Sequence, residues 1–300
     1  MLTLKELGVQ FRSKNNMVDN ITNDAPILSA VKWSESSDVF SNKVKTLQSV
    51  TPASFVDRNE GLTEVKITSS LKSYDLQKMG AKMIISHDDA LAYNGGKDAY
   101  FADSEPKILR ETGKNVEKEI VNDIWKEYCL ATTGKALKTA AASGQGYTLY
   151  AVRFVDNETC GLYQKGLPFN RTSLLERILL NGGNLTLDGD GLEVYGCILK
   201  GYFSFQIANE HSIACICNIQ DGKLPSMAQI EDLLAEVHAD NSNTILVCSP
   251  KCLSLLGGLK TASLRTSVND QSMVPGFRDW DGVPFVTSWN LTKEDFVTIS

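Results

Sequence analysis

The chain has 300 residues, a formal net charge of −6, 42% hydrophobic residues and 22% charged residues. This composition is ordinary for a folded protein with one large domain or two, and the negative charge argues against a dedicated nucleic-acid-binding protein. No apolar run is long enough to cross a bilayer, and the start lacks the hydrophobic segment of a signal peptide. We therefore expect synthesis in a cytoplasm, with no secretion and no membrane partner.

Seven cysteines are present. Cys215 and Cys217 alternate along a strand-like run, while Cys248 and Cys252 bracket a turn. A structural zinc site would need a second closely spaced pair within tetrahedral reach, which this spacing does not provide. The pattern predicts buried free thiols in a reducing compartment, with no metal and no cofactor.

The first 80 residues contain an arm and then a hairpin. Residues 1–40 are polar with short apolar islands, which predicts an arm because so little apolar surface cannot form a core. Residues 41–80 contain a strand, a turn region with Pro52 and Gly61, and a return strand over 64–80. Neither strand shows a clean apolar face, and such a hairpin is marginal alone. It is either an ordinary surface hairpin or one that lies across a neighbouring molecule.

The segment 81–86 continues the strand and breaks at His87, Asp88 and Asp89. These three side chains could indicate metal or acid–base chemistry. We favour a helix start as their explanation, because Ser86, Asp88 or Asp89 can cap a helix and acidic side chains favour its N-terminus.

A long helix is predicted over 104–131. Ser104 suits the cap position, and Glu105 with Pro106 suits the first turn. At 1.5 Å per residue this helix would span about 40 Å, which suits an extended subunit with a spine. Its apolar stripe is Ile108, Val116, Ile120, Ile124 and Tyr128, widened by Val121, Trp125 and Cys129.

A link rich in small residues follows the helix, and then strands over 147–155 and 160–166. The segment 173–183 is predicted to be a short helix that ends at glycine. Asp188 to Gly191 resembles part of a calcium loop, but it lacks the remaining ligands, so we predict a tight turn between strands.

The last third has an α/β pattern. It predicts a helix capped by Ser226, a buried strand over 244–249, and a helix that starts at Pro250 and ends at its glycine pair. His211 and His238 share no motif with a serine or cysteine nucleophile, so the sequence predicts no catalytic triad.

The order and spacing of these segments resemble tailed-bacteriophage major capsid proteins of the Hong Kong 97-like (Johnson) fold, in the short form without large insertions. The resemblance covers nearly the whole chain, and no single motif is diagnostic. It is carried by the segments APIL, VKW, KVKTLQSV, RNEG, KITSSLKSYD, HDDALA, YTLYAVRFVDNETCGLYQKG, YFSFQIANEHSIACICNI and WDGVPFVTSWNLTKEDF.

The resemblance implies an α+β capsid fold in which a peripheral P-domain carries the spine helix and an axial A-domain surrounds the five- and six-fold positions. The extended E-loop would lie over the adjacent subunit. The implied ranges are an N-terminal arm at 1–40, the E-loop at 41–80, the P-domain at 81–145 with spine helix 104–131, mostly A-domain at 146–272, and a closing P-domain segment at 273–300.

The implied function is that of a major capsid protein, assembling as hexamers and pentamers into the icosahedral head around the genome of a tailed double-stranded-DNA phage. It would be assembled in the host bacterial cytoplasm and reside in the virion capsid. Implied partners are portal and scaffold proteins, with decoration proteins as a further option, and packaged DNA held by non-specific, salt-sensitive contacts. No long helical leader precedes the arm, so we expect a separate scaffold or a cleaved leader.

Two alternatives stay open. One is an encapsulin-like compartment shell that holds enzyme cargo, and the other is a cytoplasmic enzyme that uses His87, Asp88 and Asp89. The main interpretation predicts no catalytic, cofactor-binding or metal-binding residue. Some relatives cross-link a lysine to a neighbour's asparagine, and Lys66, Lys72 and Asn59 lie in the hairpin. We predict no such bond here.

Overall fold

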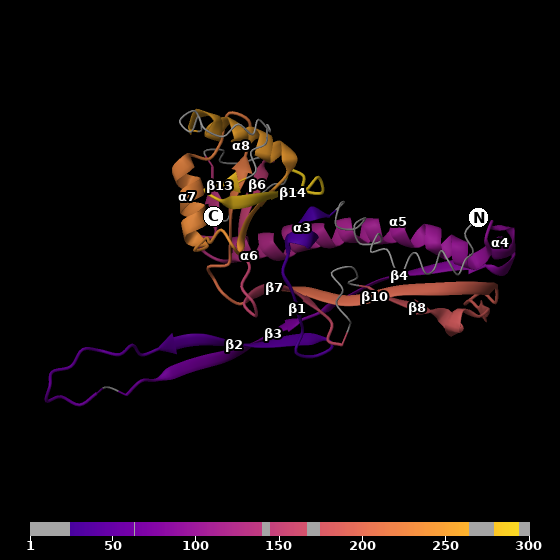
Figure 1. Ribbon diagram of the computed structural model, residues 1–300, viewed down its shortest axis with the longest axis horizontal. Helices are drawn as coiled ribbons and strands as arrows, with labels where there is room; N and C mark the ends of the chain where they lie inside the picture. The colour runs from indigo at the N-terminus through magenta and orange to yellow at the C-terminus, as the bar shows by residue number, and fades with distance from the viewer. Residues whose placement is uncertain (1–24, 63, 140–144, 167–174, 264–278, 294–300) are drawn as a thin grey trace.

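The computed structural model describes residues 25–62, 64–139, 145–166, 175–263 and 279–293. It has an elongated body, a globular lobe above one end of that body, and a long hairpin that projects away from both (Figure 1). Residues 1–24 of the expected arm lie outside the described residues. The rest of the arm contains the short helix α3 (Pro26–Ala30) and the strand β1 (Trp33–Glu35).

The spine of the body is one continuous helix made of α5 (Gly96–Lys118), a π-helical segment η1 (Glu119–Trp125) and α6 (Lys126–Ala131). The expected start at Ser104 is wrong, because the helix begins eight residues earlier, directly after Gly95, whose φ is 96°. Phe101 extends the buried stripe into this first part. Pro106 therefore lies inside the helix, where its missing N–H removes one intrahelical hydrogen bond.

The first sheet lies beneath α5. Its centre is a ten-residue antiparallel pairing of β4 with β10, from Val194 opposite Ser86 to Phe203 opposite Gln77. Met83 and Leu199 pack with Phe101 and Leu109 of the helix. The strand order is β1, β7 (Thr159–Tyr163), β10 (Glu193–Ile207) and β4 (Gln77–Ser86), and β8 (Glu176–Leu179) and β9 (Thr186–Leu187) also pair with β10.

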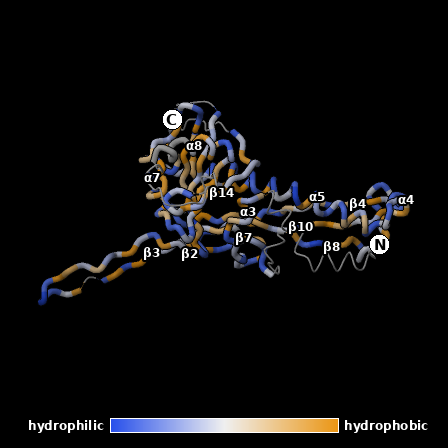
Figure 2. The backbone as a smooth tube through the Cα atoms, turned by 45° about the horizontal axis from the view of Figure 1, so that its top comes forward, coloured by the Kyte–Doolittle hydropathy of each residue, from blue (hydrophilic) through white to orange (hydrophobic). Residues whose placement is uncertain are grey.

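The second sheet forms the lobe. Helices α7 (Met227–Glu236) and α8 (Pro250–Ser263) cover one face, where Ile230, Leu233 and Leu256 join its core. The other face packs on α3 and the second half of the spine, including Ile120 and Trp125. Figure 2 shows hydrophobic segments gathered in the lobe's strands. The strand order is β13 (Asp279–Trp280), β14 (Val283–Thr287), β12 (Thr244–Cys248), β6 (Tyr147–Arg153), β11 (Ile213–Ile219) and β5 (Ala136–Lys138).

Long-range pairing divides the chain differently from the expected ranges. Residues 173–174 of a predicted helix lie outside the described residues, and over 175–183 the prediction is wrong, because Glu176–Leu179 form β8, followed by the 3-10 turn η2 (Leu180–Gly183). In the segment expected to return to the P-domain, β14 pairs with β12 of the lobe and β13 pairs with β14, while β7, β8 and β10 join the first sheet. The last helix continues past its glycine pair to Ser263. Sequence order does not show which distant strand will become a partner.

Several local predictions are confirmed. The Ser86 side chain accepts a hydrogen bond from the Asp89 N–H and caps α4 (His87–Ala92). Ser226 forms a full capping box at α7 with Gln229. Asp188 and Leu192 close a tight turn, with the Asp188 N–H donating to the Leu192 carbonyl over 2.9 Å. The seven cysteines are all buried, and none forms a disulfide bond.

Candidate assembly surface

The root of the hairpin is tied firmly to the first sheet. The hairpin consists of β2 (Ser41–Val50) and β3 (Ile67–Asp75). The Asn42 side-chain amide donates to Gln206 Oε1 over 2.6 Å, and the Tyr74 hydroxyl donates to the Ile207 carbonyl over 2.5 Å. Burial, with a smaller contribution from the nearby Tyr128, raises the pKa of Tyr74 to about 12. These contacts fix the direction in which the hairpin leaves the body.

Beyond this root, one face of the hairpin is apolar because of a β-bulge. The strand register shifts between Leu47 and Ser49. Leu47 lies opposite Ser69, and Val50 lies opposite Ile67. Since side chains alternate across a strand, the extra residue in the bulge brings Val50 to the same side as Leu47, together with Ile67 and Leu71.

This apolar face, defined by Leu47, Val50, Ile67 and Leu71, is open to solvent. The exposed fractions of its four residues are 64%, 45%, 65% and 67%. The opposite face is polar, with the hydroxyl pair of Thr46 and Ser70 at 3.0 Å. Lys45 and Ser69 lie on the same side, so the face is not cleanly apolar, as the sequence predicts. Alternation counted without the bulge did not show that these four apolar residues gather there.

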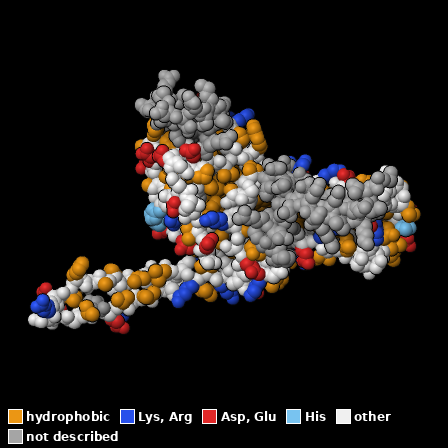
Figure 3. All heavy atoms as spheres, in the orientation of Figure 1, with side chains coloured by type: hydrophobic (Ala, Val, Ile, Leu, Met, Phe, Trp, Pro, Cys, Tyr) orange, Lys and Arg blue, Asp and Glu red, His pale blue; other side chains and the backbone are white. Residues whose placement is uncertain are grey.

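The tip of the hairpin is exposed as well. Between the strands, residues 51–62 and 64–66 form no regular secondary structure. The exposed fractions of Phe55, Leu62 and Val65 are 109%, 86% and 51%. Figure 3 shows hydrophobic side chains along the whole projection. An apolar surface of this extent, far from the core of its own subunit, is typical of an interaction site.

The alternative site at His87, Asp88 and Asp89 has ordinary structural contacts. His87 Nδ1 lies 3.3 Å from the Tyr195 hydroxyl, while the Ser86 hydroxyl donates to Asp89 Oδ2 over 2.7 Å. Asp88 and Asp89 are exposed at the start of a six-residue helix. Among the described residues, no group of three or more His, Cys, Asp or Glu side chains could hold a metal ion.

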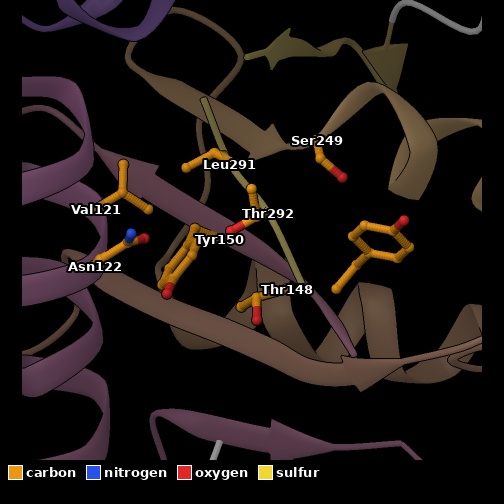
Figure 4. A pocket seen from close by; sticks show the side chains of 8 residues that line it. Val121, Asn122, Thr148, Tyr150, Ser249, Leu291 and Thr292 are labelled. Carbon is orange, nitrogen blue, oxygen red and sulfur yellow. The ribbon is translucent and has the colours of Figure 1, made fainter. Parts of the chain in front are cut away.

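One small pocket lies where the spine meets the lobe (Figure 4). Its lining includes Val121 and Asn122 from η1, Thr148 and Tyr150 from β6, and Thr292 near the chain end. It has room for about one water molecule. The buried Thr148 hydroxyl has no hydrogen-bond partner within the described residues, so a water molecule is the occupant that fits. In the described part of the chain, no helix has the length and apolar character to span a membrane.

Solved structures match this architecture over most of its length. A chain of the bacteriophage Epsilon15 structure has a TM-score of 0.54 at 11% sequence identity, covering 88% of this chain and 87% of that chain. A chain of the bacteriophage JBD30 capsid has a TM-score of 0.54 at 10% identity, covering 91% and 92%. This chain has the Hong Kong 97-like capsid fold. The α+β class and the fold expected from the sequence are confirmed.

Other comparisons add less. A chain of the holo-SrpI encapsulin complex from Synechococcus elongatus PCC 7942 has a TM-score of only 0.46 at 12% identity, covering 67% of this chain and 90% of that chain. No protein-family model matches, and a search of curated proteins finds no match.

Within the Hong Kong 97-like fold, sequence reasoning missed two features. The apolar face of the hairpin has no direct sequence signal, because a bulge must be seen in the register. The buried Glu117 does have one, since it lies four residues from both Gly113 and Val121 on the apolar side of the spine. A glutamate on the apolar side of a helix indicates that its carboxyl group forms buried polar contacts.

Proposed function

We propose that this chain is a major capsid protein, assembling as hexamers and pentamers into the icosahedral head that encloses the genome of a tailed double-stranded-DNA phage. The observation that carries the proposal is the solvent-exposed apolar face of a hairpin that projects from a capsid-fold subunit. Exposing an apolar surface to water is unfavourable, and the free energy falls when another molecule covers that surface. In a self-assembling shell that molecule is the next copy of the chain.

The proposal gives each part of the subunit a role. Residues 1–40 would be the N-terminal arm and residues 41–80 the E-loop, which lies over the adjacent subunit. The spine and the first sheet would form the P-domain, and the lobe would form the A-domain around the five- and six-fold positions. The lobe's sheet takes in β13 and β14, so the closing segment belongs with the A-domain in this assignment.

We infer no catalytic role. The remaining partners would be portal and scaffold proteins, with decoration proteins as a further option. A chain with net charge −6 suits a shell that confines DNA through few, non-specific and salt-sensitive contacts. Assembly would take place in the cytoplasm of the host bacterium, and the finished protein would reside in the virion capsid.

Expression of the full chain, sizing chromatography and negative-stain imaging test the proposal. Closed particles of uniform diameter are expected, alone or once the neighbouring phage proteins are supplied. A small oligomer that persists with those proteins present would contradict the shell. The particle contents then distinguish a phage head, which holds DNA, from an encapsulin-like compartment, which holds cargo protein.

Deletion of residues 51–63 gives a sharper test of the hairpin. Among the described removed residues, all but the partly buried Val56 are exposed, and residues 51–62 lie outside both hydrophobic sheets, so the subunit should stay folded and soluble. We expect few closed particles, because the tip can no longer reach the next subunit. Normal closed shells from this variant would show that the hairpin is not the assembly contact.

A further inference from the structure

Glu117 is a fully buried carboxylate near the end of α5, two residues before the π-helical segment begins at Glu119. Its exposed fraction is 0%. In the described part of the chain it forms no salt bridge with a lysine, arginine or histidine. A buried carboxyl group without a cationic partner destabilises the folded state unless hydrogen-bond donors surround it.

The carboxyl group accepts hydrogen bonds from segments far apart in the sequence. The Ile27 N–H donates to Oε2 over 3.0 Å. From the other end of the chain, the Asn290 side-chain amide donates to Oε1 over 3.0 Å, and the Ser288 hydroxyl donates to the same oxygen. The two ends of the described chain therefore meet on one side chain of the spine.

The contact at α3 replaces a missing cap. The residue before this helix is Ala25, which offers no side-chain hydrogen bond, so the first N–H of α3, that of Ile27, is satisfied by Glu117. The position is also held by packing, because Ile27 and Leu28 are 0% and 7% exposed in the main core. The Trp33 indole N–H then donates to the Leu28 carbonyl over 3.1 Å.

We propose that Glu117 is a positioning residue for assembly. It clasps the root of the N-terminal arm (residues 25–31) and the closing segment (residues 288–290) to the spine, and so fixes the position of residue 25 on the subunit core. The inference rests on the proposed function for its assembly role, whereas the clasp itself is a property of the single subunit.

The arrangement requires a carboxyl group in particular. Each of these hydrogen bonds is donated to the carboxyl group, so the side chain must present two accepting oxygens. Glutamine at this position would turn one accepting oxygen into an NH₂ group that faces donors, although its size and shape are almost unchanged. Glu117→Gln therefore tests the hydrogen bonding without opening a cavity.

The test is hydrogen exchange on the unassembled full chain, read at two amides of the first turn of α3: that of Ile27, which donates to Glu117, and that of Leu28, which donates to the Ala25 carbonyl. In Glu117→Gln we expect these amides to exchange about tenfold to a hundredfold faster, the factor that follows from losing hydrogen bonds to a charged acceptor. The matched control is Glu111→Gln, which alters an exposed glutamate of the same helix, paired with Lys114 at 2.9 Å. The control should leave both amides protected. Unchanged protection in folded Glu117→Gln would overturn the clasp.

A second variant covers failure to fold. If Glu117→Gln does not fold, Ser288→Ala removes one donor, leaves the carboxyl group in place, and should accelerate the same two amides by a smaller factor. No acceleration would overturn the clasp.

Assembly is then compared at one protein concentration. We expect fewer closed particles from Glu117→Gln than from wild type and Glu111→Gln, and equal yields despite faster exchange would refute the positioning role. If wild type itself never assembles, the proposed function fails, while the exchange result still decides the clasp.

Discussion

The apolar face of the hairpin allows a quantitative prediction for the double variant Leu47→Asn/Leu71→Asn. These two leucines are 64% and 67% exposed in the subunit, so about two thirds of each side chain is available for burial. Complete burial of a leucine side chain is worth about 1.5–3 kcal/mol, so the pair should contribute roughly 2–4 kcal/mol to each subunit contact. This corresponds to a loss of about 30-fold to 1000-fold in the association constant.

The assay measures the protein concentration at which light scattering reports shells, together with the urea midpoint of the unassembled subunit. The midpoint should barely change, because substitutions of exposed side chains usually alter stability by about 0.5 kcal/mol or less. Lys72→Asn is the matched control, since Lys72 is exposed on the opposite face of the same strand. A double variant that assembles at the wild-type concentration would refute the apolar face as the contact. A large fall in the urea midpoint would show that the leucines pack within the subunit.

Two further predictions concern the single subunit. A Cβ atom on Gly161 would lie 2.5 Å from the Trp33 ring, so Gly161→Ala should lower the free energy of unfolding in urea by about 1–3 kcal/mol. Gly189→Ala, with nothing within 4 Å, is the control, and an equal loss there would contradict the reasoning. The hydrogen bond from Lys135 lowers the pKa of Glu236, so the pair stabilises the fold above the ordinary glutamate pKa of 4.5 and this stability is lost as pH falls through the lowered value. Glu236→Gln should flatten thermal stability over that acidic range, and an unchanged pH dependence would exclude the pair as its source.

Helix caps and turns could be predicted from the sequence, because their hydrogen-bonding partners are close neighbours in the chain. Ser86 capping α4, Ser226 opening α7 and Asp188 closing a turn each involve donors and acceptors within four residues. Short-range geometry of this kind follows from residue type and spacing alone. The order of the segments likewise sufficed to predict the α+β capsid fold.

Only the tertiary structure showed the features that depend on residues far apart in the sequence. The spine starts at Gly96 because Phe101 finds a core beneath it, and residues 176–179 form a strand because β10 pairs with them. The face of the hairpin changes with one bulged residue, and Glu117 joins segments 90 and 173 residues away. Such contacts depend on which surfaces the whole chain brings together, and burial in that shared interior outweighs local preference.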